Sequence, residues 1–104
     1  MNLAMNAAGA SEMKQQHGAV VVKSGRVLSI GINKLKNNPE HVVGYGLCSI
    51  HAEADAISRV KNPRGAAIYI ARVNNNGEPR LSRPCDDCAK MIRDVGISKI
   101  VYTD

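Results

Sequence analysis

The pattern of apolar and polar positions predicts three helices that alternate with four strands. Apolar residues three and four positions apart favour a helix, whereas short β-branched runs favour a strand. The helical pattern covers residues 2–15, 49–61 and 85–95, and the strand pattern covers residues 19–23, 26–33, 66–73 and 97–103. The expected order along the chain is therefore α-β-β-α-β-α-β.

This order predicts a single α/β domain over residues 1–104. The first two strands are joined by Ser24-Gly25, a tight turn typical of an antiparallel hairpin. The later strands are separated by helices, so they should lie parallel and be joined by right-handed crossovers. We expect a three-layer α/β/α arrangement, with a mixed sheet of about four strands and helices on both faces. Gly31 in the second strand indicates a bulge or a close backbone approach.

Several local signals refine the helices. Leu3, Ala7 and Ala10 form the expected buried stripe of the first helix, and Ser49 is a suitable N-cap for the second. Gly96 follows the third helix at the place of a C-terminal glycine. Residues 34–48 contain glycines, asparagines and a proline, so we expect a loop. A loop of this length is more often functional than idle, and it leads directly to His51.

Two short motifs carry metal-binding chemistry at the expected helix starts. They are His51-Ala52-Glu53 and Pro84-Cys85-Asp86-Asp87-Cys88. One imidazole and two thiolates are a common zinc set, and a catalytic zinc keeps its fourth position for water. The carboxylate of Glu53, two residues after His51, could then exchange protons beside the metal without being a ligand.

Amino-acid composition restricts the cellular location and the kinds of binding partner that we expect. The 104 residues carry 14 basic and 9 acidic side chains, for a net charge of +5. This favours an anionic partner such as a nucleotide phosphate or a nucleic-acid strand, although a basic solvated surface explains it equally well. No signal peptide or membrane span is recognisable, and three cysteines without an export signal favour metal or redox chemistry. We therefore expect a cytoplasmic protein with no membrane partner.

Taken together, His-x-Glu followed by Pro-Cys-x-x-Cys resembles the zinc-dependent cytidine/deoxycytidylate deaminase superfamily. The resemblance covers most of the chain and implies a cytidine deaminase-like fold. It implies zinc ligands at His51, Cys85 and Cys88, and a proton shuttle at Glu53. It also implies two substrate contacts: the backbone of Ala52 would contact the base, and Asn33 would line the sugar side of the pocket.

The implied reaction makes the protein a hydrolase of C–N bonds in cyclic amidines. Its expected substrate is a cytosine base in a free nucleotide or nucleoside, most simply deoxycytidylate or cytidine, with release of ammonia. A rival reading within the class is a deaminase of cytosine or adenine in single-stranded DNA or RNA. The basic charge suits that rival, but the chain has three Tyr, no Phe and no Trp for base stacking.

Other readings of the same residues stay open. Cys48 could join the three ligands in a closed Cys3His structural zinc site of a binding module without turnover. Cys85 and Cys88 could also form a redox pair. His17 could edge the pocket or cap the start of a strand, and Asn33 could be only a strand-ending turn residue. His41 has no identified partner, and three basic side chains could grip a phosphate or face solvent: Lys34, Lys36 and Arg83.

The chain departs from the family pattern in two places. Many members continue past the fourth strand into a further helix and strand, whereas this sequence reaches Asp104 there. An open edge strand would favour a homo-oligomer. The stretch 74–83 is also longer than the usual link, so it could form a hairpin beside the active site.

Overall fold

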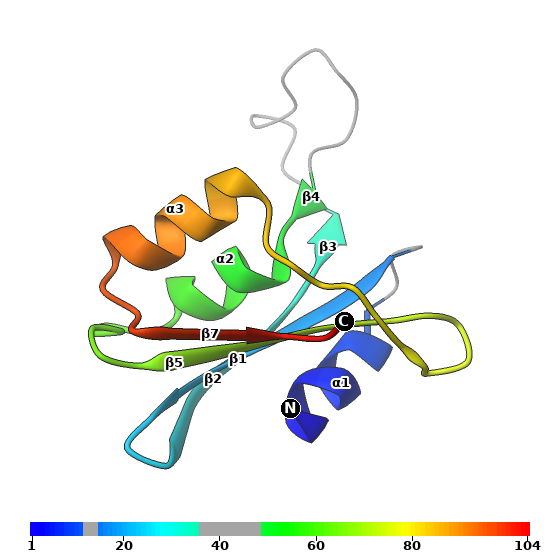
Figure 1. The fold of residues 1–104 in the computed structure, drawn as a ribbon, viewed down its shortest axis with the longest axis horizontal. Coiled ribbons are helices and arrows are strands. Elements are labelled where there is room, and N and C mark those ends of the chain that lie inside the picture. Colours follow the sequence, from blue (N-terminus) through cyan, green and yellow to red (C-terminus); the bar gives the residue numbers. More distant parts are fainter. Residues whose placement is uncertain (12–14, 36–48) are drawn as a thin grey trace.

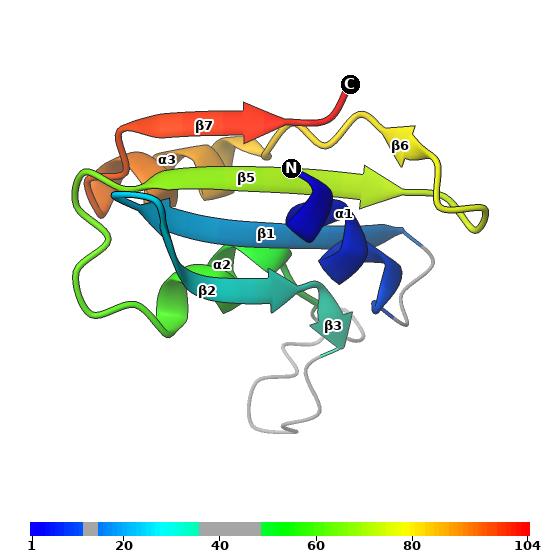
Figure 2. The same ribbon diagram turned by 90° about the horizontal axis from the view of Figure 1, so that it is seen from below.

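A mixed sheet lies between one helix on its first face and two helices on its second (Figures 1 and 2). The computed structural model describes residues 1–11, 15–35 and 49–104. The helices are α1 (Asn2–Gly9), α2 (Ala52–Ser58) and α3 (Asp86–Asp94). The strands are β1 (Gln16–Lys23), β2 (Arg26–Ile32), β3 (Lys34–Leu35), β4 (Ser49–Ile50), β5 (Ala67–Val73), β6 (Pro79–Arg80) and β7 (Lys99–Tyr102). The predicted three-layer α/β/α fold is confirmed.

The main sheet has the order β2-β1-β5. The other edge of β5 pairs with two strands: β7 along its first part and β6 along its last residues. β1 and β2 form the predicted antiparallel hairpin, whose turn residues Ser24 and Gly25 have φ values of 52° and 76°. β5 and β7 are parallel, as expected for strands joined through a helix. The fifth strand is β6, which folds back antiparallel on β5. Residues 74–83 thus include a hairpin, as predicted.

A second, two-stranded sheet changes how the middle of the chain is understood. β3 pairs antiparallel with β4, so Lys34–Leu35 and Ser49–Ile50 are strands rather than loop and helix. The prediction that Ser49 caps α2 is therefore wrong: this pairing keeps Ser49 extended, and His51 occupies the N-cap position. Residues 36–48 of the predicted loop lie outside the described residues.

The first face of the sheet is covered by α1, which packs on a glycine of β1. A side chain at Gly18 would collide with the backbone of α1, at the carbonyl oxygen of Ala4 and the amide of Ala8. Ala4 and Ala8 are fully buried, whereas Leu3 is 41% exposed. The predicted stripe of Leu3, Ala7 and Ala10 is therefore wrong, because the face that approaches Gly18 must carry the smallest side chains. The helix predicted over 2–15 ends at Gly9.

We predict that Gly18→Ala will lower the free energy of unfolding by about 3 kcal/mol, because the added methyl group meets helix backbone that cannot rotate away. Chemical denaturation monitored by circular dichroism measures this. The matched control is Gly9→Ala, where a Cβ would have no atom within 4 Å and the free energy should change by less than about 0.5 kcal/mol. Equal effects of the two substitutions would contradict the packing described here.

The second face carries the larger core, which joins the sheet to α2 and α3. Its fully buried members are Ala19, Val21, Ala52, Ala56, Ala66, Ile68, Ile70 and Ile92. A Cβ on Gly31 would stand 2.5 Å from both the carbonyl oxygen of Ala52 and the amide of Ala56. Gly31 thus allows a close backbone approach of α2 to β2, which was one of the two predicted reasons for this glycine. The helix predicted over 49–61 is shorter than expected and ends at Ser58.

At the last helix, prediction and structure agree. α3 begins directly after Cys85, and Gly96 follows its C-cap with a φ of 87°. Among the described residues no strand pairs with the outer edge of β7, and the expected homo-oligomer stays a prediction. The described helices include none that is both long and apolar enough to cross a lipid bilayer.

Candidate metal centre

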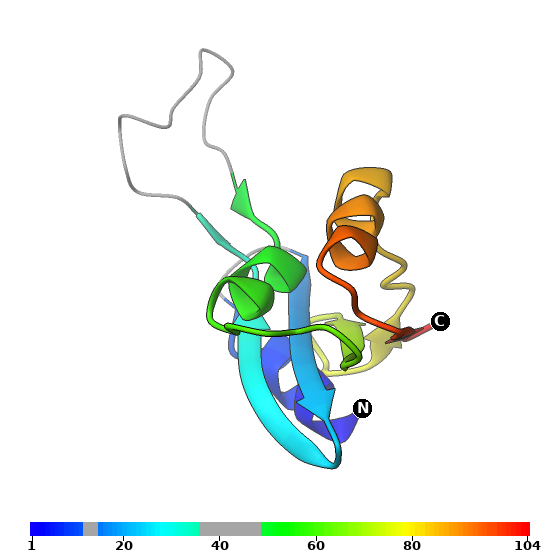
Figure 3. The same cartoon turned by 90° about the vertical axis from the view of Figure 1, so that its left-hand side faces the viewer.

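Both predicted motifs lie at the same end of the sheet. Asp55 of α2 accepts a hydrogen bond from the amide of Ile32, so α2 starts near the end of β2. Ser82, which precedes α3, donates its hydroxyl to the carbonyl of Ile70 in the middle of β5, so the segment before α3 lies along the second half of that strand. Figure 3 shows α2 and α3 next to each other on one face of the sheet. The carboxyl ends of strands in α/β sheets are the usual place for a binding crevice.

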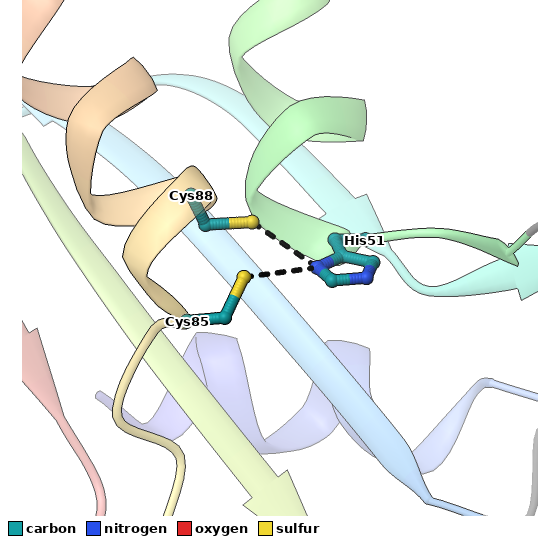
Figure 4. Close-up of side chains that lie close together, drawn as sticks. All are labelled: His51, Cys85 and Cys88. Atoms are coloured by element: carbon teal, nitrogen blue, oxygen red, sulfur yellow. Dashed lines mark hydrogen bonds between the residues drawn. The ribbon is translucent and has the colours of Figure 1, made fainter.

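The three predicted ligands come together between these two helix starts (Figure 4). The Nδ1 atom of His51 lies 3.1 Å from Cys88 Sγ and 3.8 Å from Cys85 Sγ. The ligand atoms of all three residues lie within 4.8 Å of one another. His51 and Cys85 are each the N-cap residue of a helix, and Cys88 lies one turn further into α3. The spacing of the two motifs on helix starts therefore produces one compact cluster.

The size of this cluster fits a tetrahedral zinc ion. Bond lengths of about 2.3 Å to sulfur and 2.0–2.1 Å to nitrogen imply ligand separations of about 3.5–3.8 Å. Of the two nitrogen–sulfur separations, 3.8 Å is at the upper limit of this range and 3.1 Å is slightly shorter. Within residues 1–11, 15–35 and 49–104 the cluster has three members, with Cys88 buried and the other two exposed. These residues could hold a zinc ion with a coordination position left for a non-protein ligand.

The electrostatics around Cys88 also fit a cation. Burial raises the pKa of the Cys88 thiol above its ordinary value, and the negative charge of nearby Glu53 raises it further. A buried thiol and a buried carboxylate so close together repel each other when both are ionised. A bound divalent cation compensates such charges and deprotonates a ligating thiol. Glu53, only 4% exposed, thus lies beside the predicted ligands, and its expected role as a proton carrier stays a prediction.

The position of α2 depends on a buried carboxylate that the sequence did not single out. Asp55 accepts hydrogen bonds from the amide of Ile32 at 3.1 Å and from the guanidinium of Arg59 at 2.8 Å. Arg59 in turn donates to the carbonyl of Ile30. Asp55 therefore attaches the helix that carries His51 and Glu53 to the end of β2. The sequence signal that could have identified Asp55 is its place on α2 next to the alanines that form the apolar face of that helix.

We predict that Asp55→Ala will lower the free energy of unfolding by about 2 kcal/mol, because the half-buried amide of Ile32 and the guanidinium of Arg59 lose their acceptor. Thermal and chemical denaturation measure the loss. The control is Asp94→Ala, an exposed carboxylate near the end of α3, for which less than about 0.5 kcal/mol is expected. If both variants unfold alike, Asp55 does not anchor α2.

Asn33 and Ala52 lie near the cluster, one at a strand end and one at a helix start. Asn33 is 8% exposed, and its side chain binds the start of β1 and the segment before it. Its Oδ1 atom accepts hydrogen bonds from the hydroxyl of Ser11 and from the amide of His17. Its Nδ2 atom donates to the carbonyl of Gln15. Ala52 is the first residue of α2, so its amide has no partner within the helix. The substrate contacts expected of Asn33 and Ala52 stay predictions.

Some sequence alternatives cannot be placed. Cys48, His41 and Lys36 lie outside the described residues, as does the side chain of Lys34. The closed Cys3His alternative, which needs Cys48, therefore stays open. Arg83 is exposed, two residues before Cys85, and both cysteines of the pair are free thiols. Ser11, which supports Asn33, was not singled out because its partners are far away in sequence.

Comparisons with known proteins agree with this geometry. The family profile described as the cytidine and deoxycytidylate deaminase zinc-binding region matches residues 1–104. The deoxycytidylate deaminases of Enterobacteria phages T2 and T4 are each 27% identical to the chain over 127 aligned positions. These matches cover 84% of this chain but 68% and 66% of the phage proteins, so the chain spans about two thirds of their length.

Solved structures show the same fold at low sequence identity. The apo dCMP deaminase of cyanophage S-TIM5 has a TM-score of 0.68 at 24% identity, covering 97% of this chain and 79% of that one. The same enzyme in complex with dCMP and dUMP gives 0.65 at 22% identity, with coverages of 94% and 76%. Cytidine deaminase from Mycobacterium tuberculosis gives 0.62 at 24% identity, with coverages of 97% and 78%. The chain therefore shares the fold of enzymes that act on nucleotides and on nucleosides.

Proposed function

Because the chain belongs to the cytidine and deoxycytidylate deaminase zinc-binding family, we propose that it hydrolyses the exocyclic amine of a cytosine base. The substrate is a free nucleotide or nucleoside, either deoxycytidylate or cytidine, and the products are the uracil form and ammonia. The observation that carries this proposal is a buried carboxylate beside a three-ligand cluster: Glu53 is close enough to Cys88 to raise its pKa. A site that only held a structural metal would have no use for this carboxylate.

The residues divide into metal ligands and a proton carrier. His51, Cys85 and Cys88 would hold the zinc ion through one nitrogen and two sulfur atoms. When bound, zinc would lower the pKa of water towards neutrality and so supply the nucleophile. Glu53 would accept the two protons of that water in turn, and it would deliver the first to the ring nitrogen and the second to the departing amine. The water oxygen would thus become the carbonyl of the uracil form, the ring nitrogen would keep one proton, and the amine would leave as ammonia with the other.

The scaffold around these residues would orient the base. The amide of Ala52 has no partner within α2, so it is free to donate to a carbonyl oxygen of the pyrimidine. Glu53 is buried, which removes its carboxylate from bulk water and strengthens its interaction with the base. The rigid attachment of α2 to β2 through Asp55 keeps both groups in place during the reaction.

Within this class we favour deoxycytidylate. The phage T2 and T4 relatives are named deoxycytidylate deaminases, and the cyanophage enzyme was solved with dCMP and dUMP. The net charge of +5 favours an anionic substrate over a neutral nucleoside. Exposed Arg83 beside Cys85 and half-buried Arg72 at the end of β5 are available for a phosphate group.

A deaminase of single-stranded nucleic acid is the main rival for the same site. Such proteins stack bases on aromatic side chains, and Tyr69 and Tyr102 are the aromatic residues within the described part of the chain. Tyr69 is half-buried against the core beneath α1, on the face away from the metal cluster. This leaves little described aromatic surface for stacking, and it supports the choice of a free nucleotide.

The test is ammonia release by the zinc-loaded protein from four compounds: deoxycytidylate, cytidine, adenosine and a short single-stranded oligonucleotide. We expect deoxycytidylate to react with the highest kcat/KM. Turnover of the oligonucleotide alone would overturn the substrate class. No turnover of any compound by a protein that holds one zinc ion would favour the binding module.

A further inference from the structure

His17 lies on the side of the sheet that faces the metal cluster. Its neighbour Gly18 points into α1 on the opposite face, and successive residues of a strand point to opposite faces. His17 therefore shares a face with Ala19, which packs against Ala52 and Ala56 of α2. β1 is the strand that runs behind the three ligands in Figure 4. The imidazole is thus placed on the floor of the site rather than under α1.

The register of the sheet places His17 at the functional end. In the β1–β5 pair His17 is directly opposite Arg72, and directly opposed residues of antiparallel strands share a face. Arg72 is the second-to-last residue of β5, and His17 is the second residue of β1. Both therefore lie at the end of the sheet where α2 and α3 begin.

The backbone of His17 is held on both sides by Asn33. The amide of His17 donates to Asn33 Oδ1 at 2.9 Å, and the amide of Asn33 donates to the carbonyl of His17 at 3.2 Å. Ser11 donates its hydroxyl to the same Oδ1 atom at 2.6 Å. Ser11 and Asn33 are buried, at 3% and 8% exposure. This buried network holds the backbone of His17 in place, and it therefore restricts where the half-buried imidazole can lie.

The charges around the imidazole identify its neighbours and its protonation state. Burial lowers the pKa of His17 below its ordinary value; Glu53 acts in the opposite direction, and Arg72 and His51 act with burial. The net effect favours the neutral form of the imidazole. These effects also place the ring within electrostatic range of Glu53 and His51, two residues of the candidate centre.

We propose that His17 is a substrate-binding residue of this site, whose imidazole forms a hydrogen bond with the bound pyrimidine nucleotide. A neutral imidazole offers one N–H donor and one nitrogen acceptor, whereas the neighbouring wall of Ala19 and Ala52 offers no polar side-chain group. Ser11 and Asn33 are positioning residues for His17, because their hydrogen bonds hold its backbone in place. This inference rests on the proposed function and adds a contact that the two motifs do not contain.

The experiment compares two substitutions of His17 with deoxycytidylate as the probe. His17→Leu keeps a similar volume but removes the hydrogen bond, so KM should rise about tenfold while kcat changes less than about threefold. His17→Asn restores a donor and an acceptor and should recover at least half of the lost KM effect on a logarithmic scale. Lys23→Leu, at the far end of the same strand, is the control and should leave both constants unchanged.

An equilibrium measurement separates this inference from the proposed function. Calorimetry with deoxycytidylate on zinc-loaded Glu53→Gln should show about tenfold tighter binding than on the same variant that also carries His17→Leu. Equal affinities would overturn the role of His17 even if the wild type is an active deaminase. Loss of kcat at constant KM, or no recovery by His17→Asn, would do the same. If the wild type neither binds nor converts deoxycytidylate, both proposals fail.

Discussion

Glu53→Gln is expected to lower kcat for deoxycytidylate by about a thousandfold while the protein still binds one zinc ion. The substitution keeps the size of the side chain but removes the group that can accept and return a proton. Glu53 is buried beside the cluster, so bulk water cannot replace it at the reacting atoms. Steady-state ammonia release measures kcat, and metal analysis of the same sample verifies the zinc content.

The chain offers a matched control for this substitution. Asp87 follows Cys85 by two residues, as Glu53 follows His51, but Asp87 is exposed. Asp87→Asn removes the same charge close to a ligand, and it should change kcat less than about threefold. If the two variants lose equal activity, the effect comes from the charge near the metal and not from proton transfer. A Glu53→Gln variant with more than a tenth of the wild-type kcat would contradict the assigned role.

The fold was largely predictable because its elements carry strong local signals. The apolar spacing through Ile92 and the glycine at 96 define α3, and Ser24-Gly25 defines the hairpin. The wrong predictions concern α1 and the start of α2, where contacts with residues far away in sequence determine which side chains are buried and where the helix begins. Ala4 and Ala8 are buried because Gly18 allows the helix backbone onto the strand. No pattern within residues 2–15 contains that information.

The same distinction holds for the candidate site. The ligand triad was predictable because zinc requires specific side-chain types at short spacings, and each motif contains them within one helical turn. The supporting residues were not, since Ser11 reaches Asn33 across 22 positions and Asp55 reaches Ile32 across 23. His17 was considered from the sequence, but its side of the sheet could be assigned only once Gly18 was seen against α1. Local chemistry thus predicted the cluster of His51, Cys85 and Cys88, whereas the residues around it are identified only by the pairing of the strands.

Cys88→Ser is expected to reduce the zinc content from about one ion per chain to near zero after dialysis, and turnover should disappear with it. Cys88 is the buried member of the triad, and its Sγ atom lies 3.1 Å from His51 Nδ1. Burial at this position keeps solvent-exposed side chains from replacing Cys88 as a ligand. A serine hydroxyl does not provide the thiolate that zinc favours. Metal analysis and ammonia release measure the two effects.

The free energy of unfolding distinguishes loss of the metal from loss of the fold. Zinc that binds only the folded chain stabilises it, so the zinc-loaded wild type should unfold at higher denaturant concentration than Cys88→Ser. After chelation the two proteins should differ by about 1–2 kcal/mol at most, because the serine side chain is smaller than the thiol and buries a hydroxyl group. A large difference that persists without metal would mean that Cys88 acts mainly through core packing.

Cys48→Ser is the control that decides how many protein ligands the metal has. With three ligands, at His51, Cys85 and Cys88, the Cys48→Ser variant should keep its zinc and its turnover. Loss of zinc on replacing Cys48 would instead indicate a closed Cys3His site, in which no coordination position is left for water. The catalytic proposal requires that open position, so this one substitution tests the metal centre and the reaction together.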